Sequence, residues 1–123
     1  MTLTRLVCGI GARQREAEIA TAISLLPVAE SVACILEGLA DADSPLQQWT
    51  EKPQLRLNRI TPGCPCCVGN LVMRVTLNRV LRSAPRHLFV SIANSAHREQ
   101  IRAFLLSPPY DGYLILQDDL IAP

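Results

Sequence analysis

The sequence predicts an α/β fold in three layers with a parallel sheet, and two observations carry that prediction. Short, continuously apolar runs recur along the 123 residues, and stretches of helical periodicity separate most of them. Apolar runs of this kind suit strands that are buried on both faces of a parallel sheet. Strands that alternate with helices require right-handed crossovers, which place helices on both faces of the sheet. The length fits one domain, which we expect to span residues 1–123.

The first half of the chain predicts three strands and one helix. The expected strands cover residues 2–8, 31–36 and 55–60, and the expected helix covers residues 13–26. Ile19, Ile23 and Leu26 recur at helical spacing, and Pro27 ends the pattern. Cys34 lies in the second apolar run, so we expect it in the core. Residues 37–53 are polar and rich in turn formers, which indicates a long loop or a short helical excursion.

The second half predicts two more helices and two more strands. The expected helices cover residues 71–82 and 97–106, and the expected strands cover residues 87–92 and 112–117. Asn70 is a candidate cap for the first of these helices, whose apolar residues form one stripe. Arg74, Asn78 and Arg82 form a neighbouring polar stripe, which we expect to face solvent.

Charge and composition exclude several kinds of partner. Twelve basic residues oppose eleven acidic ones, and the basic residues are spread along the chain. No electrostatic footprint for nucleic acid or for an anionic membrane appears, so we expect neither partner. The N-terminus lacks a signal-peptide pattern and no run is long enough to span a membrane, which predicts a cytoplasmic protein. The sequence leaves the oligomeric state open.

Three of the five cysteines lie within residues 63–67, which read Gly-Cys-Pro-Cys-Cys. The prolines at 62 and 65 fix φ and remove backbone donors, so we expect a stiff turn that holds the thiols in place. Cys64, Cys66 and Cys67 are therefore candidate ligands of a soft metal such as zinc, with a fourth ligand from elsewhere or from water. The predicted helix after the turn favours thiolate over thiol through its N-terminal dipole. Two alternatives stay open, namely redox chemistry at the adjacent Cys66 and Cys67, and plain core packing.

Polar residues follow several of the predicted strands. The carboxyl ends of parallel strands form the working edge of such a sheet, so these residues should line one rim. They are residues 9–15, Glu37, residues 91–94 and Asp118. His87 and His97 are weaker ligand candidates, because His87 begins a strand at the opposite rim and His97 begins a helix.

Taken in this order, the residues resemble the GTPase domain of the CobW family, a metal-handling branch of P-loop proteins related to HypB and UreG. In that family a second strand ends in Asn-Glu, and a Gly-Cys-x-Cys-Cys turn precedes a helix. Residues 63–67 fit the cysteine motif at every fixed position, and Glu37 fits the glutamate. The resemblance spans nearly the whole chain and implies a shortened P-loop NTPase fold. It adds Glu37 to the three cysteines as a candidate metal ligand.

The phosphate loop departs from the family pattern. A P-loop needs G-x-x-x-x-G-K-[ST], whereas residues 9–16 read Gly-Ile-Gly-Ala-Arg-Gln-Arg-Glu. Aligned on the first glycine, Gln14 replaces the second glycine, Arg15 the lysine and Glu16 the hydroxyl that binds magnesium. Ser91 also stands where the family has a glutamate at the end of a strand. What remains is a vestigial phosphate loop, whose candidate contacts are Gly9, Gly11, Arg13 and Arg15.

The sequence therefore predicts a degenerate CobW-like module that binds zinc, does not bind GTP and has lost the GTPase motifs. Such a module would handle metal or regulate another protein, so a protein partner stays open. Three alternatives remain: a divergent GTP-binding metallochaperone with GTPase activity, a thiol redox protein, and a relic that acts only by contacting a partner.

Overall fold

The computed structural model describes residues 1–38, 44–46, 54–60 and 68–122, except for the side chains of residues 68–70. The fold is α/β with a parallel sheet, as the sequence predicts. Its strands are β1 (Thr2–Cys8), β2 (Val32–Glu37), β3 (Leu55–Ile60), β4 (His87–Ser91), β5 (Leu114–Leu116) and β6 (Leu120–Ile121). Its α-helices are α1 (Ala12–Ser24), α2 (Val68–Arg82) and α3 (Arg98–Leu105). Two short 3-10 helices, Ser95–His97 and Tyr110–Gly112, flank α3.

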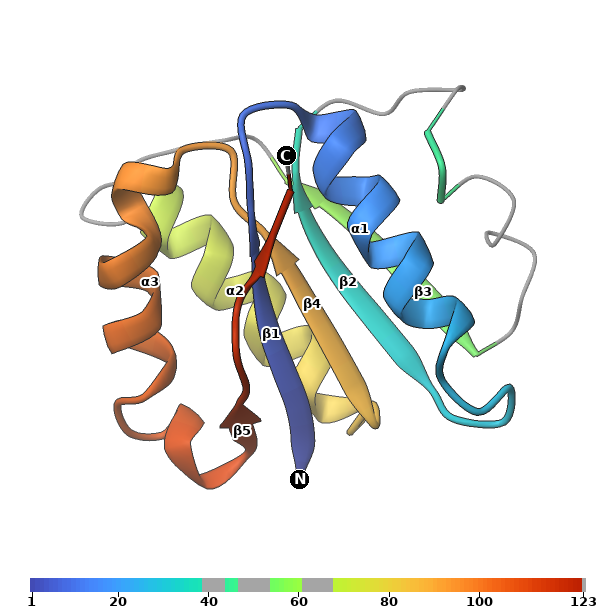
Figure 1. The fold of residues 1–123 in the computed structure, drawn as a ribbon. Helices are drawn as coiled ribbons and strands as arrows, with labels where there is room; N and C mark the ends of the chain where they lie inside the picture. The colour runs from blue at the N-terminus through green and yellow to red at the C-terminus, as the bar shows by residue number, and fades with distance from the viewer. Residues whose placement is uncertain (39–43, 47–53, 61–67, 123) are drawn as a thin grey trace.

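The sheet lies between α1 on one face and α2 and α3 on the other (Figure 1), and it separates two apolar cores, one on each face. The strand order is β3-β2-β4-β1-β5, with β6 also pairing with β1, and every pairing is parallel. Helix α1 covers one face, while α2 and α3 cover the other. Successive strand residues alternate between the faces, so Leu6 packs toward α2 and α3 and Val7 packs toward α1. Cys34 is buried in the core under α1, which confirms its predicted place.

The connections of the sheet diverge between β1 and β4. Helix α1 carries the chain from β1 across one face to β2, on the far side of β4. Helix α3 carries the chain from β4 to β5, on the far side of β1. In open α/β sheets, ligands bind in the crevice outside the carboxyl ends of the strands at such a point. We call the region beyond Cys8, Glu37 and Ser91, which end β1, β2 and β4, the switch-point crevice.

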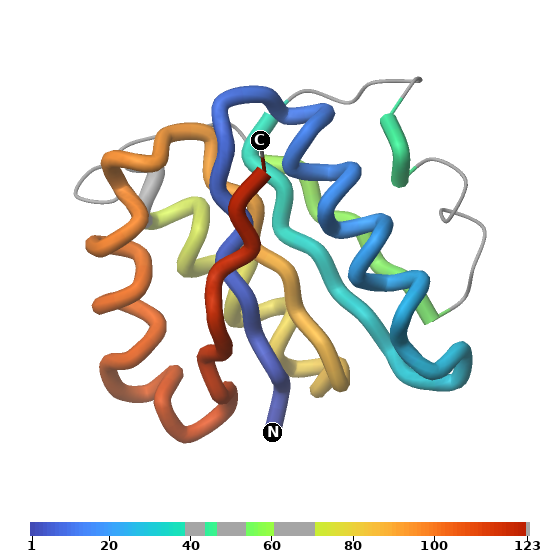
Figure 2. Tube along the Cα trace, viewed as in Figure 1, coloured from blue at the N-terminus to red at the C-terminus, as the bar shows by residue number. Residues whose placement is uncertain are grey.

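The last part of the chain runs beside β1 toward the carboxyl edge (Figure 2). β5 pairs only with Thr2–Thr4, and β6 pairs with Val7 and Cys8. Asp118 therefore lies beside the middle of β1, and its predicted place at the carboxyl rim is wrong. The sequence shows where β5 ends but not that β5 pairs with the amino-terminal half of its neighbour.

Asn70 is not the cap of α2, because that helix begins two residues earlier, at Val68. β3 forms as predicted and pairs with β2 from Leu55 to Ile60.

None of the helices in the described part of the chain has the length and apolar character that crossing a bilayer requires.

Candidate functional site at the carboxyl edge of the sheet

Glu37 is the last residue of β2 and lies buried at the carboxyl edge, opposite Ile60 at the end of β3. The backbone N–H of Ala93, just beyond β4, donates a hydrogen bond of 3.1 Å to its Oε1. Gly38 follows with φ +144, a conformation that side chains disfavour, and its N–H donates to the Ile60 carbonyl at 3.1 Å. The Glu37 carboxylate is thus oriented by the protein, and a carboxylate has lone pairs for several partners.

The cysteine motif lies outside the described residues. The described chain enters residues 61–67 from Ile60, beside Glu37, and continues at Val68, the first residue of α2. The roles of Cys64, Cys66 and Cys67 as metal ligands stay a prediction. Within the described ranges, no group of three or more His, Cys, Asp or Glu side chains could hold a metal ion.

The other two cysteines are free thiols in the core. Desolvation raises the pKa of the Cys34 thiol strongly. Desolvation also raises the pKa of Cys8, with a further contribution from the Asp119 carboxylate and an opposing one from Arg98. Both thiols are therefore held in the protonated, unreactive form, because the thiolate is the nucleophile and the metal ligand.

Arg15 fills the switch-point crevice from α1 and is only 2% exposed. Its Nε donates to the Ser91 hydroxyl at 2.8 Å, and its Nη1 donates to the carbonyl of Gly9 at 2.8 Å and, more weakly, to that of Ile10 at 3.4 Å. Its Nη2 donates to the carbonyl of Glu37 at 3.2 Å. Burial lowers the pKa of Arg15 and the nearby Glu37 carboxylate opposes this, but a guanidinium stays charged in proteins. One side chain thus joins the ends of β1, β2 and β4.

Glu16, the next residue, is also buried, and its carboxylate pairs with an arginine of β3. Arg59 of β3 donates to both of its carboxylate oxygens, from Nη1 and from Nη2 at 3.0 Å each. The Ser44 hydroxyl donates to the same carboxylate. The two residues that stand at the P-loop lysine and hydroxyl positions are therefore both engaged inside the protein.

The two glycines of the vestigial phosphate loop make room for the protein's own atoms. A Cβ at Gly9, whose φ is +154, would lie 2.7 Å from the Cβ of Ala122. A Cβ at Gly11 would lie 1.9 Å from the side-chain oxygen of Gln14, which folds back over the start of α1. Arg13 is exposed on the same turn of the helix. The roles of these residues as phosphate contacts stay a prediction.

A second polar cluster, which the sequence reasoning missed, joins α3 to the end of the chain. Arg102 donates to the Asp119 carboxylate, and Arg98 Nε lies 3.7 Å from the same oxygen. Within the described residues, Asp119 Oδ1 and Arg98 Nε are buried without a hydrogen-bond partner. Arginines four positions apart on a helix lie on one face, so the spacing of Arg98 and Arg102 indicates that both can contact the same partner. Their partner could not be read from the sequence, because it depends on the position of β6.

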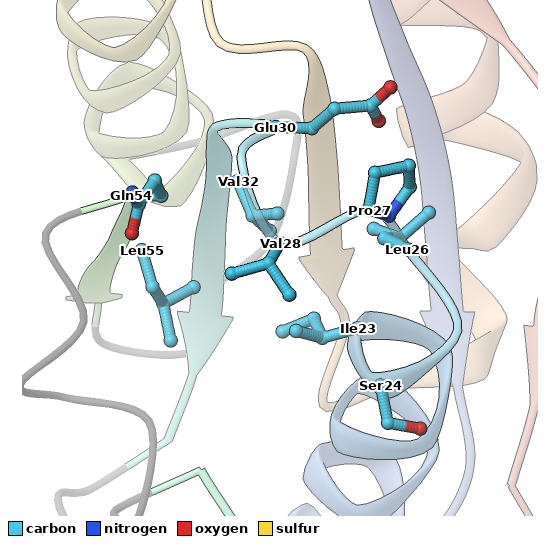
Figure 3. A pocket seen from close by; sticks show the side chains of 9 residues that line it. All are labelled: Ile23, Ser24, Leu26, Pro27, Val28, Glu30, Val32, Gln54 and Leu55. Atoms are coloured by element: carbon cyan, nitrogen blue, oxygen red, sulfur yellow. The ribbon is translucent and has the colours of Figure 1, made fainter.

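The histidines lie where the sequence places them. His87 begins β4 at the amino edge of the sheet and is paired with Glu30. His97 ends the 3-10 helix that leads into α3. The same amino edge carries an apolar hollow of about 180 Å³, lined among others by Ile23, Val28 and Leu55 (Figure 3). This hollow and the Glu37 site lie at opposite ends of the strands.

Comparison with known proteins finds one informative similarity. No protein-family model matches the chain, and no solved structure matches it significantly. Over 65 residues, or 52% of this chain, it is 37% identical to the zinc chaperone YeiR of Escherichia coli (strain K12). The match covers 20% of that curated relative. Over about half of its length, this chain is thus similar to a zinc chaperone.

Proposed function

We propose that this chain is a CobW-like module, folded as one domain, that binds and handles zinc. The candidate ligands are Cys64, Cys66, Cys67 and Glu37. The similarity to a zinc chaperone over half of the chain supports this proposal, as does the resemblance of the cysteine motif to the CobW family. The metal ion is then the cargo or regulatory ligand of the module.

The position of Glu37 is the observation that carries the proposal furthest. Its carboxylate is buried, oriented by Ala93 and placed next to Ile60, the last described residue before the cysteine motif. Zinc in proteins takes thiolate, imidazole and carboxylate ligands in a tetrahedral shell. A motif that supplies three thiols therefore needs one more donor, and Glu37 is an oxygen donor at the point where the chain enters that motif.

The contacts of Arg15 and Glu16 support the further proposal that GTPase chemistry is lost. Phosphoryl transfer in P-loop proteins depends on a lysine that reaches the phosphates and a hydroxyl that holds magnesium. In this chain the side chains at those two positions are buried and bonded to Ser91, Arg59 and backbone carbonyls. We accordingly propose a metal-binding module without nucleotide turnover.

Metal analysis of protein purified without chelator tests the proposal. We expect one zinc ion per chain under reducing conditions, and we expect the double variant Cys66→Ser, Cys67→Ser to lose it. Cys34→Ala is the matched control, because it removes a thiol that is buried in the core. If the double variant retained one zinc per chain, the proposed ligands would be wrong.

A further inference from the structure

The switch-point crevice presents hydrogen-bond acceptors to its occupant. Backbone carbonyls of Gly9, Ile10 and Glu37 and the hydroxyl of Ser91 all accept from Arg15. In a phosphate-binding loop the arrangement has the opposite polarity, because backbone N–H groups point at the anion. The crevice in this protein is therefore built to hold a cation.

We propose that Arg15 is the permanent occupant of this crevice, a built-in guanidinium that joins three strand ends and excludes phosphate. Its bonds reach residues 76 and 22 positions away along the chain, at Ser91 and Glu37. The guanidinium fork donates in several directions at once, which a lysine ammonium of the same charge cannot match. The carboxyl edge of the sheet is thereby organised without a bound nucleotide.

The surrounding charges favour this occupant over a phosphate. A buried cation is tolerated only where it is paired and hydrogen-bonded, and the carboxylates of Glu37 and Glu16 act on Arg15 electrostatically. Arg59 balances Glu16 in turn. A phosphate in the crevice would have to displace the guanidinium and would then face carbonyl oxygens and two carboxylates. Both changes are unfavourable, so the crevice discriminates by the sign of the charge.

Arg15 also positions the candidate metal ligand. Its Nη2 holds the backbone carbonyl of Glu37, while Ala93 holds the carboxylate of the same residue. The end of β2 is thus anchored from both sides. This inference goes beyond the proposed function and stands whether or not the cysteines bind zinc, because its evidence is the set of contacts around the guanidinium.

Chemical rescue of Arg15→Ala tests the proposal. The variant should melt about 10 °C or more below the wild type, because several buried acceptors lose their donor together. Methylguanidinium at low millimolar concentration should restore much of the loss. Sodium chloride and methylammonium at equal ionic strength should restore less. Neither pyrophosphate nor GTP with magnesium should raise the melting temperature of the variant.

Two further variants keep the test decisive. Arg79→Ala removes the same charge from an exposed position on helix α2 and should leave the melting temperature nearly unchanged. Arg15→Lys should fold with an intermediate loss, because it keeps the charge without the fork. If Arg15→Ala is unfolded in buffer, the return of far-UV circular dichroism with methylguanidinium replaces the melting curve.

Three outcomes would overturn the proposal. The first is an Arg15→Ala variant no less stable than Arg79→Ala. The second is that methylguanidinium raises the melting temperature of Arg15→Ala no more than methylammonium does. The third is stabilisation of Arg15→Ala by pyrophosphate, which would show that the emptied crevice accepts anions. Loss of zinc binding in the cysteine variants bears on the proposed function alone, so the two proposals can fail separately.

Discussion

Arg59→Ala should lower the free energy of unfolding, because it breaks the buried ion pair between Glu16 of α1 and Arg59 of β3. Arg59 donates to both carboxylate oxygens of Glu16 at 3.0 Å, and the two side chains are 18% and 4% exposed. Arg59→Ala leaves the deeper partner charged and buried, with the Ser44 hydroxyl still donating to it. Breaking a buried pair in this way typically costs about 3–5 kcal/mol of stability.

The structure places the expected loss at the lower end of that range. Arg59 keeps some contact with water, and Ser44 continues to donate to Glu16, so we expect Arg59→Ala to lower the free energy of unfolding by about 3 kcal/mol. Glu16→Gln should cost less, about 1–2 kcal/mol, because it leaves the charge on the more exposed partner. Urea denaturation followed by circular dichroism measures both, and the slope m should not change.

Arg56→Ala is the matched control, since Arg56 is an exposed arginine on the same strand. It should change the free energy of unfolding by less than about 0.5 kcal/mol. If Arg59→Ala cost no more than this control, the pair with Glu16 would not stabilise the fold. The penalty is assigned to the buried carboxylate, so a larger loss in Glu16→Gln than in Arg59→Ala would also contradict the prediction.

Three other predictions test separate features of the fold and of the site. Gly9→Ala should lower the free energy of unfolding by about 1–3 kcal/mol, because φ is +154 and the new Cβ would lie 2.7 Å from the Cβ of Ala122. A Cβ at Gly112 would have no neighbour within 4 Å, so Gly112→Ala should be close to neutral in the same urea titration. Burial raises the pKa of Cys34 above that of an unfolded thiol. The free energy of unfolding should therefore fall by about 1.4 kcal/mol per pH unit above about pH 8.5, where the unfolded thiol ionises. Cys34→Ala should make this fall less steep between about pH 7.5 and pH 9.5. Glu37→Gln should weaken zinc binding by about tenfold or more in competition with a chromophoric chelator, and an unchanged affinity would remove Glu37 from the ligand set.

The strands that are buried on both faces could be predicted from sequence, and the polar contacts between them could not. The run around Cys34 is typical of an internal strand because residues 32–36 are all apolar, and the structure buries all of β2. The apolar stripe predicts helix α2 but not the residue at which it begins, since Asn70 lies inside the first turn. Helix ends are set by local contacts that periodicity does not report.

The candidate site divides in the same way. The position of Glu37 at the carboxyl edge follows from the end of an apolar strand, and the structure places it there. The partners of Arg15 and Glu16 cannot be predicted from the sequence, because the sequence shows only that these residues depart from a P-loop pattern. Their partners, Ser91 and Arg59, lie on β4 and β3, so the contacts depend on strand order.

The fold class and the chemistry that the chain can offer are visible in the amino-acid sequence alone. Apolar periodicity is a local property, and three thiols in one turn are visible without coordinates. The folded sheet is needed to see that α1 turns an arginine into the switch-point crevice and a glutamate toward β3. A buried charge is stable only where distant strand ends supply its partners, and those ends meet only after folding.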